Sequence, residues 1–410
     1  MQEMTDTDVA IIGAGPAGSF LATHLALNGV SVEVFERETF PRFHVGQSLV
    51  PMSIPLLEEI DVDLASVDYS VRKEGALFYS TEMDELRRFD FDNTMDGTFT
   101  YAYQVERGPF DKHLADRASE AGARIRYNHT VKDWTERDDS VVIEGNEDTS
   151  TAKYMVDATG QRAMMAHKQN AFERIEEFGQ TASFGLFRDV TNDRFQDLFQ
   201  HGDVLVLTFG DAWGWCIRLP DDKASVGLVE RDPVTGRAAE TVIENLQSNC
   251  PFFDDLLEGA RPPEQYHRSA NYSFVNNCPV TDRVVAVGDA YTFLDPIYAS
   301  AIHRAFYSAR LLSKELVEHL ETNRDLQLTS YFHEVNRACK VFTRMIEKFY
   351  NTNWIENMFF GENQPLKTQR EITSILCGDI WRDDNQYQNM MLNASRGAYF
   401  SDHASSENTA

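Results

Sequence analysis

The sequence predicts an α/β fold in which a parallel sheet is interleaved with an antiparallel sheet and a helical segment follows. Three observations support this prediction. Residues 7–36 read as strand, glycine-rich turn, helix and strand, a unit whose two strands run parallel. Residues 180–230 alternate apolar and polar positions, as antiparallel strands with one covered face do. From about 302 to 350 the apolar spacing is helical.

The first unit divides into clear elements. Residues 7–12 are apolar enough for a buried strand, and the glycine-punctuated residues 13–18 follow. An apolar helix then continues through Leu27 until Gly29 stops it. Residues 30–36 form the second strand. Such a unit needs further parallel strands beside it, which must come from elsewhere in the chain.

Later segments supply those strands. A helix is expected where Phe110, Leu114 and Ala118 repeat at a spacing of four. Short buried strands are expected at 154–158 and 284–287. Because these segments lie far apart in the sequence, the architecture is interleaved and no single cut separates two domains. We expect one unit from 1–70, 100–180 and 275–330, an antiparallel unit from 71–99 and 181–274, a helical segment at 331–400 and a disordered tail at 401–410.

Composition excludes several classes of protein. The 410 residues include 38 Lys and Arg against 65 Asp and Glu, a net charge of −27, and 42% are hydrophobic. That apolar content is too high for intrinsic disorder, and the acidic surface disfavours nucleic acid or an anionic membrane as a partner. No apolar run reaches the ~18 residues that span a bilayer, and no secretory leader is visible. With five scattered cysteines and no CxxC pair, we expect a cytoplasmic protein with reduced thiols and no metal site.

The glycine-rich turn predicts a dinucleotide site. Gly13 allows the tight turn, and Gly15 lets the backbone approach a pyrophosphate at the start of the helix. Ala17 lies in the same turn, and Gly18 allows the helix to pack on the strand. Glu36 ends the second strand, where it suits a ribose hydroxyl.

Further residues identify the nucleotide. Residues 288–289 (Gly-Asp) end a strand where the carboxylate suits ribityl hydroxyls, and Arg42 and Arg107 are expected near the pyrophosphate charge. With residues 156–160, these features resemble the FAD-binding set of aromatic-hydroxylase-type flavoprotein monooxygenases, from residue 7 to about 312. The resemblance implies a Rossmann-type FAD-binding domain interleaved with a substrate domain built on the antiparallel sheet.

Three segments narrow the resemblance. Residues 40–51 (FPRFHVGQSLVP) resemble the Gly-Glu-Ser-Leu loop of flavin-dependent halogenases. Residues 213–218 (WGWCIR) resemble their Trp-x-Trp-x-Ile-Pro signature, and 295–302 (DPIYASAI) their Asp-Pro-x-x-Ser-Ser-Gly-Val segment. Lys73 matches the active-site lysine of the family in residue type and spacing.

The halogenase resemblance implies a reaction. Reduced FAD and oxygen oxidise chloride or bromide that is bound beside the flavin near Ser300 and Ala301. The hypohalous acid reaches Lys73, which guides the halogen to an electron-rich ring. Ser48 and Pro296 would contact the cofactor, while Trp213 and Trp215 would line the substrate pocket. No NAD(P)H site is visible, so a separate flavin reductase is expected as a partner.

The sequence departs from the halogenase pattern at Gln47, Arg218 and Ala301, where the family carries Glu, Pro and Gly. These changes keep an alternative open, a related FAD-dependent monooxygenase or oxidoreductase that does not use halide. A flavin-bound regulatory protein without turnover is a third reading. Tyr298 takes the place of the catalytic Glu of tryptophan halogenases, so a phenolic or pyrrolic substrate, free or tethered to a carrier protein, is expected in the pocket.

Overall fold

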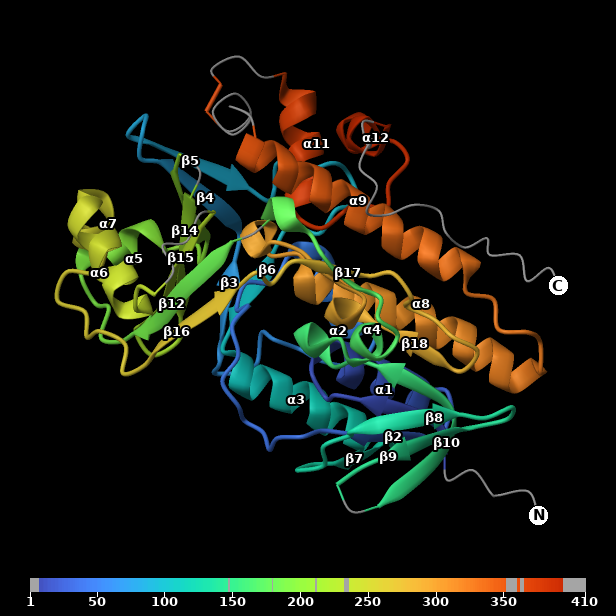
Figure 1. The fold of residues 1–410 in the computed structure, drawn as a ribbon. Coiled ribbons are helices and arrows are strands. Elements are labelled where there is room, and N and C mark those ends of the chain that lie inside the picture. The colour runs from blue at the N-terminus through green and yellow to red at the C-terminus, as the bar shows by residue number, and fades with distance from the viewer. Residues whose placement is uncertain are drawn as a thin grey trace.

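A computed structural model describes residues 7–146, 148–178, 180–210, 212–231, 236–351, 360–361 and 365–393. The expected tail at 401–410 and parts of the expected helical segment at 331–400 lie outside these residues. Figure 1 shows the chain as two sheets, with long helices between and beside them.

The first sheet is built around the predicted strand–turn–helix–strand unit. Its strands lie in the order β7-β2-β1-β10-β9-β8, and β18 also pairs with β10. The pairs β1–β2, β1–β10, β2–β7 and β10–β18 are parallel, whereas β8, β9 and the start of β10 form an antiparallel meander. The strands are β1 (Thr7–Ile12), β2 (Val32–Phe35), β7 (Arg124–Arg126), β8 (Asp133–Glu136), β9 (Val141–Glu144), β10 (Thr149–Asp157) and β18 (Val284–Ala286).

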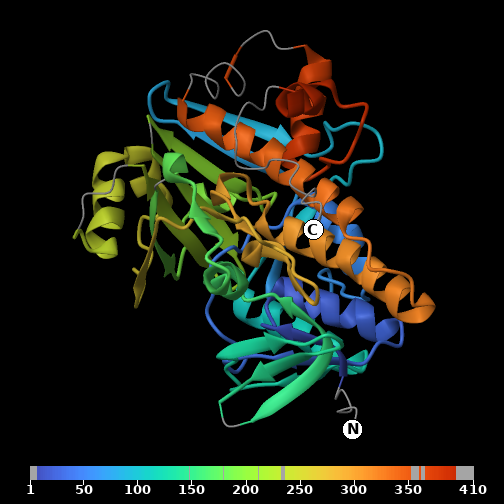
Figure 2. The same ribbon diagram turned by 45° about the vertical axis from the view of Figure 1, so that its right-hand side comes forward.

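Three helices pack beside this sheet. Helix α1 (Pro16–Leu27) lies against both α3 (Arg107–Glu120) and α8 (Ala301–Thr322). Phe20 of α1 stacks on Phe306 of α8, with ring centroids 5.1 Å apart. Figure 2 shows α8 and the helix that follows it running side by side along one flank of the molecule. The start of α8 is thereby brought to the glycine turn, although almost 300 residues separate them.

The second sheet has the order β16-β12-β15-β14-β13-β4-β5. All its pairs are antiparallel except β13–β4. A buried cluster that includes Leu205, Leu207 and Phe253 fills the face covered by short helices. The strands are β4 (Gly75–Ser80), β5 (Glu85–Asp90), β12 (Thr181–Phe187), β13 (Val204–Phe209), β14 (Ala212–Leu219), β15 (Lys223–Glu230) and β16 (Tyr266–Ala270), and the helices are α5 (Asp193–Leu198), α6 (Ala239–Asn249) and α7 (Pro251–Leu256).

Smaller elements join the two sheets. A two-stranded sheet pairs β3 with β6, and a three-stranded sheet has the order β11-β17-β19. Their bounds are β3 (Ser70–Lys73), β6 (Ala102–Val105), β11 (Phe172–Arg174), β17 (Phe274–Asn276) and β19 (Thr292–Phe293), and the short helices are α2 (Ile54–Glu58) and α4 (Met164–Lys168), with 3-10 turns η1 (Pro51–Ser53), η2 (Gly160–Arg162), η3 (Glu176–Phe178), η4 (Gly288–Ala290) and η5 (Pro296–Tyr298).

The predicted fold class is confirmed, with one refinement in the helical region. The helical pattern from 302 to 350 is not one helix, because Asn323 takes a left-handed conformation (φ 53°) and ends α8. The chain resumes as α9 (Thr329–Asn351) after six residues. No helix in the described parts of the chain is long and apolar enough to cross a bilayer.

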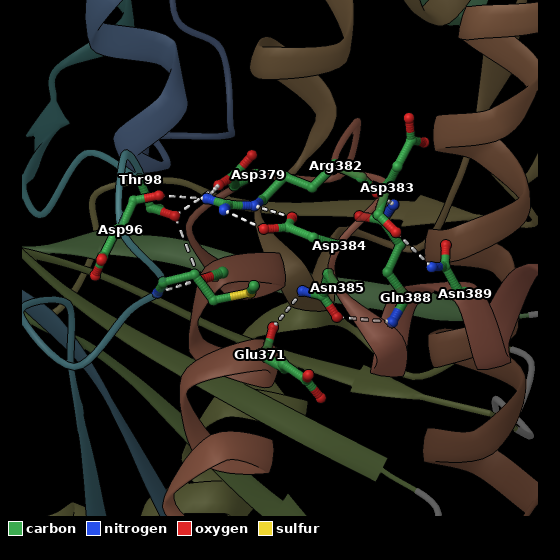
Figure 3. A network of polar contacts seen from close by, with 12 residues as sticks. Asp96, Thr98, Glu371, Asp379, Arg382, Asp383, Asp384, Asn385, Gln388 and Asn389 are labelled. Carbon is green, nitrogen blue, oxygen red and sulfur yellow. Dashed lines mark hydrogen bonds and ion pairs between the residues drawn. The ribbon is translucent and has the colours of Figure 1, made fainter.

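The C-terminal helices α11 (Leu366–Leu376) and α12 (Gln386–Asn393) are attached through polar contacts around Arg382 (Figure 3). Arg382 donates to the carbonyl of Asp96 (2.6 Å) and to the carboxylates of Asp379 (3.1 Å) and Asp384 (2.8 and 2.9 Å). Thr98 donates to the same Asp379 carboxylate at 2.6 Å. These bonds fix the end of α11 against the 92–101 loop, which follows β5.

Candidate active site

A cavity of about 640 Å³ lies where the glycine turn, the inner face of the second sheet and the start of α8 meet. Most residues predicted for the site line it. Three do not: Gly18, Gly288 and Ser300 are absent from its walls. The predicted residues that do line the cavity are Gly13, Gly15, Ala17, Glu36, Arg42, Ser48, Lys73, Arg107, Trp213, Trp215, Asp289, Pro296, Tyr298 and Ala301.

The glycines of the turn have two different tasks. A Cβ on Gly13 (φ 105°) would lie 2.6 Å from the carbonyl oxygen of Ala158, and one on Gly18 would lie 1.9 Å from that of Gly13. Both glycines are therefore required by packing within the fold. A Cβ on Gly15 would meet only the Arg42 guanidinium, at 3.8 Å. Gly15 thus leaves room for a ligand rather than for the protein.

Glu36 is buried and already holds the glycine turn. Its carboxylate accepts hydrogen bonds from the backbone N–H of Ala14 (2.9 Å) and of Glu38 (2.9 Å). The turn after β1 is thus tied to the end of β2 before any ligand is bound. Because a carboxylate has about four lone-pair sites, Glu36 retains capacity for a ligand hydroxyl in the cavity.

A buried ion-pair cluster supports the opposite wall. Arg107 donates to both carboxylate oxygens of Asp111, at 2.8 and 3.1 Å, and Arg42 donates to one of them at 3.3 Å. Arg107 also donates to the carbonyl of Val45 at 2.6 Å, which fixes the loop that precedes Gly46. The two guanidinium groups are held in place for an anion by a carboxylate that is fully buried.

Asp289 fits a sugar-alcohol ligand. Its Oδ1 is buried and accepts no hydrogen bond within the described residues, and its nearest cation, Arg304, is 3.8 Å away. Burial raises the pKa of this carboxyl. A buried acceptor of this kind is expected to have a partner, and the hydroxyls of a flavin ribityl chain are of the right chemistry. Gly288 takes φ 60°, and a Cβ there would lie 3.0 Å from that of Ala17, so it serves the contact between α1 and α8.

The charge of the cavity wall is opposite to that of the chain. The whole sequence has 65 acidic and 38 basic residues, but the wall has more basic groups than acidic ones. A positive wall in an acidic protein suits a polyanionic ligand such as a pyrophosphate. With the space at Gly15 and the orphan oxygen of Asp289, the residues present fit FAD. The basic lining residues are Arg37, Arg42, Lys73, Arg107, Arg162 and Arg268, and the acidic ones are Glu36, Glu38 and Asp289.

Lys73 ends β3 inside the protein, with its side chain only 2% exposed. Its ammonium donates to the Ser48 hydroxyl (2.9 Å) and the Leu49 carbonyl (3.0 Å), and lies 5.2 Å from the ring centroid of Phe91. No carboxylate of the described chain lies within 4 Å of it. Burial lowers the pKa of Lys73 to about 8. Two of its three N–H donors are used, which leaves one for a ligand.

The segment before α8 has the geometry of an anion site. Pro296–Tyr298 form a 3-10 turn, Ala299 is left-handed (φ 51°), and α8 begins at Ala301 and runs for 22 residues. The first N–H groups of a long helix lack backbone partners and carry partial positive charge. Ser300 is buried and lies off the cavity wall.

The three departures from the halogenase pattern are accommodated locally. Ala301 is helical, so its side chain requires no unusual backbone angle; the left-handed residue is Ala299. Gln47 accepts from the Gly46 N–H at 3.1 Å, as a carboxylate could. Arg218 lies off the cavity wall and donates to the Phe199 carbonyl at 3.5 Å.

The two tryptophans of β14 lie on one face of the strand, with ring centroids 5.6 Å apart. Each indole N–H is occupied: Trp215 donates to the Ser225 hydroxyl (3.2 Å) and Trp213 to the Tyr350 hydroxyl (2.9 Å). Tyr298 donates to the Met345 carbonyl at 3.3 Å and also lines the cavity. The wall is therefore aromatic, and its polar atoms are paired with protein.

Sequence reasoning missed a buried carboxylate network behind this wall. Asp295 belongs to the 295–302 segment that resembles the halogenases, but no role was predicted for it. It accepts hydrogen bonds from the hydroxyls of Tyr272 (3.3 Å) and Tyr350 (3.0 Å). Tyr350 lies near the end of α9, and no motif in the sequence singles it out. A second missed feature is an aromatic stack at the cavity, in which the ring of Phe43 lies 4.4 Å from that of His267.

The comparisons with known proteins agree with this geometry. The FAD binding domain family matches residues 6–345. The chain is 28% identical to a 1H-pyrrole-2-carbonyl peptidyl-carrier-protein chlorinase of Pseudomonas fluorescens, over 92% of this chain and 90% of the relative. It is 26% identical to the corresponding brominase of Pseudoalteromonas luteoviolacea, over 92% and 93%.

A solved flavoprotein/dehydrogenase from Cytophaga hutchinsonii superposes with a TM-score of 0.86 at 25% identity, covering 93% of this chain and 95% of that one. The match to the family extends from the first strand of the glycine-turn unit to α9, so it includes both sheets and, of the cavity-lining residues, all except Leu376. The chain therefore belongs to the FAD-binding domain family, and its similarity to the chlorinase and the brominase confirms the predicted resemblance to flavin-dependent halogenases.

Proposed function

We propose that this protein halogenates an electron-rich ring, pyrrolic or phenolic, with Lys73 as the residue that guides the halogen. The observation that carries the proposal is the state of Lys73 in the cavity. It is buried, no carboxylate among the described residues lies within 4 Å of it, and it shares the cavity with the start of α8 and with Trp213 and Trp215. A lone buried ammonium is costly, so a function for it is expected.

The chemistry divides between cofactor and protein. Reduced FAD, bound along the glycine turn with Arg42, Arg107 and Asp289, would supply the two electrons that activate oxygen. The N–H groups at the start of α8 would hold the halide. The Lys73 ammonium would donate its free N–H to the oxygen of hypohalous acid, which makes the halogen more electrophilic. Overall, reduced FAD, oxygen, halide, one proton and a ring C–H give FAD, a ring carbon–halogen bond and two waters.

The substrate is proposed to be a pyrrole or phenol ring, including one carried as a thioester on a carrier protein. Two relatives are a chlorinase and a brominase of pyrrolyl carrier proteins. The cavity offers aromatic walls from Trp213 and Trp215, which suit a flat ring. Among the described residues, the carboxylates that line the cavity are Glu36, Glu38 and Asp289, and all three lie at the nucleotide end. The ring end of the described lining therefore has no carboxylate that could bind the ammonium of a free amino acid.

A separate flavin reductase is proposed as the source of reduced FAD. The sequence has one dinucleotide turn, and its cavity is expected to be filled by FAD itself. Mixing the protein with a purified flavin reductase, NADH and FAD should support turnover, whereas NADH without the reductase should not.

The test supplies chemically reduced FAD, oxygen and bromide or chloride with a simple phenol and a pyrrolyl carrier protein. We expect halogenated product from the wild type, and a loss of at least about a thousandfold in Lys73→Met, which keeps the length of the side chain but removes the ammonium. Lys112→Met is the matched control, because Lys112 is exposed on α3 and pairs with the exposed Asp116. Product from Lys73→Met at the wild-type rate would reject the role of Lys73.

The competing function is an FAD-dependent oxidoreductase that does not use halide. The similarity to a solved protein described as a flavoprotein/dehydrogenase favours it. Hydroxylated or dehydrogenated product at the same rate with and without halide would support this function and reject halogenation.

A further inference from the structure

A chain of buried hydrogen bonds runs behind the tryptophan wall. The indole N–H of Trp213 donates to the Tyr350 hydroxyl at 2.9 Å, and that hydroxyl donates to Oδ2 of Asp295 at 3.0 Å. The Tyr272 hydroxyl donates to the same oxygen at 3.3 Å, and Oδ1 accepts from the N–H of Ile297 at 3.1 Å. All of these side chains are buried.

We propose that Tyr350 is a positioning residue that fixes the indole of Trp213 in the cavity wall and thereby sets which carbon of the substrate ring faces the halogenating group. The proposal rests on the proposed function, because it assigns the wall to the substrate. It adds a residue from α9 to a site that is otherwise built from β3, β14 and the start of α8.

The direction of the bonds makes Tyr350 specific. An indole N–H can only donate, and an ionised carboxylate can only accept, whereas a tyrosine hydroxyl does both. The Tyr350 hydroxyl therefore accepts from Trp213 and donates to Asp295. Helix α9 is anchored at this point, because Arg231 donates to the Tyr350 carbonyl at 3.0 Å and lies 5.6 Å from its ring centroid.

The network also connects the tryptophan wall, formed by Trp213 and Trp215, to the segment that is proposed to hold the halide. This halide segment comprises residues 295–301. Asp295 is the N-cap of the 3-10 turn Pro296–Tyr298, which leads to Ala301 at the start of α8. No cation of the described chain lies within 4 Å of Asp295, so its position depends on the two tyrosines and the Ile297 N–H. Tyr350 thus aligns the ring-binding wall with the halide segment, which is the geometry that decides the site of substitution.

Without the Tyr350 hydroxyl, the Trp213 indole would be held by packing and by a weaker contact with the Asp295 carboxylate. Its aromatic neighbour on the same strand is Trp215, tilted by 43° at a centroid distance of 5.6 Å. A ring with a weaker polar anchor can rotate within such a wall, and a small rotation changes the space offered to a five- or six-membered ring. Loss of a buried hydrogen bond typically corresponds to a change of about tenfold in an equilibrium constant.

The experiment compares three tyrosine variants in the full-length protein loaded with FAD. Tyr350→Phe removes the acceptor of the Trp213 N–H. Tyr272→Phe removes the other donor to Asp295 but leaves the Trp213 bond intact. Tyr331→Phe removes a buried hydroxyl of the same helix that donates to the Ala286 carbonyl at 3.1 Å, away from the cavity.

We expect Tyr350→Phe to raise KM for the ring substrate about tenfold, with a smaller change in kcat, and to alter the ratio of positional isomers or the number of halogens added. Its FAD affinity should equal that of the wild type. Tyr331→Phe should keep the wild-type product ratio, and Tyr272→Phe, which leaves the Trp213 bond intact but removes one donor to Asp295 at the cavity, should change the ratio less than Tyr350→Phe does. A wild-type KM and product ratio in Tyr350→Phe, or the same altered ratio in all three variants, would overturn the proposal.

A second readout does not depend on halogenation. Ultraviolet resonance Raman spectra report hydrogen bonding of an indole N–H, and subtracting the spectrum of Trp213→Phe isolates the Trp213 band. That band should indicate a hydrogen-bonded N–H in the wild type and in Tyr272→Phe, and a more weakly bonded N–H in Tyr350→Phe. An unchanged band in Tyr350→Phe refutes the anchor, whereas a shifted band in a protein that gives no halogenated product refutes only the proposed function.

Discussion

The two ends of the cavity treat buried charge in opposite ways. At the nucleotide end, the guanidinium groups of Arg107 and Arg42 both bond the carboxylate of Asp111. At the other end, Lys73 has no carboxylate within 4 Å and Asp295 has no cation within 4 Å, as far as the described residues extend. The two arginines of the nucleotide end thus share a carboxylate partner within the protein, whereas Lys73 and Asp295 have no oppositely charged partner at this distance among the described residues.

The difference appears in proton affinities. Burial lowers the pKa of Lys73 to about 8 and raises that of Asp295 to about 6. Paired charges give a rigid cradle for a ligand. Unpaired charges with pKa values near 7 are suited to exchange or share protons. The comparison indicates that binding and chemistry are separated along one cavity, and three predictions test this separation.

The largest expected effect is at the nucleotide end. Asp111→Ala leaves the buried Arg107 guanidinium without its carboxylate and should lower the free energy of unfolding by about 3 kcal/mol, with loss of FAD binding. Urea unfolding with and without FAD measures both. The matched control is Asp116→Ala on the same helix, whose partner Lys112 is exposed, with an expected change of at most about 0.5 kcal/mol. If Asp111→Ala and Asp116→Ala lowered the free energy of unfolding equally, the buried ion pairs at the nucleotide end would have no special structural role.

The next largest effect is the contribution of Lys73 to the pH dependence of the free energy of unfolding. The folded pKa of Lys73, about 8, lies below the ordinary value of 10.5, so the folded state binds the proton more weakly than the unfolded state does. The wild type therefore carries a penalty that is full below pH 8 and disappears as pH rises to about 10.5, on the order of 3 kcal/mol. Lys73→Met lacks this titration and should be the more stable protein at pH 7.

The measurement is the difference in unfolding free energy between wild type and Lys73→Met at several pH values, because other titrating groups cancel in the difference. The difference should shift in favour of the wild type between pH 8 and pH 10.5. Lys112→Met serves as the exposed control and is measured at the same pH values. A flat difference for Lys73→Met would mean that an undetected anion neutralises this end of the cavity.

The sequence could predict the parts of the site whose roles depend on local spacing. Gly13, Gly15 and Gly18 follow from a turn between strand and helix, and Trp213 and Trp215 share a face because strand side chains alternate. Tyr350 could not be predicted, because its hydroxyl meets an indole 137 residues away and the chain has 15 tyrosines. Which of them meets Trp213 depends on how α9 packs over β14.

The smallest expected effect is on the free energy of unfolding when Ala299 or Ala301 of the halide segment is replaced by glycine. Ala301 is helical, so Ala301→Gly should lower the free energy of unfolding by about 0.5 kcal/mol, the ordinary cost of glycine in a helix. Ala299 is left-handed at φ 51°, a conformation that costs L-residues energy, so Ala299→Gly should raise it by about 0.5 kcal/mol.

Urea unfolding of the two variants tests whether their free energies of unfolding change in opposite directions. We expect the halide KM of Ala301→Gly to remain within about twofold of the wild type, because the helix start keeps its N–H groups whether or not a methyl group is present. If Ala301→Gly instead stabilised the protein and lowered the halide KM severalfold, the Ala301 side chain would be an obstruction at the halide end. The unpaired end of the cavity would then be limited by shape as well as by charge.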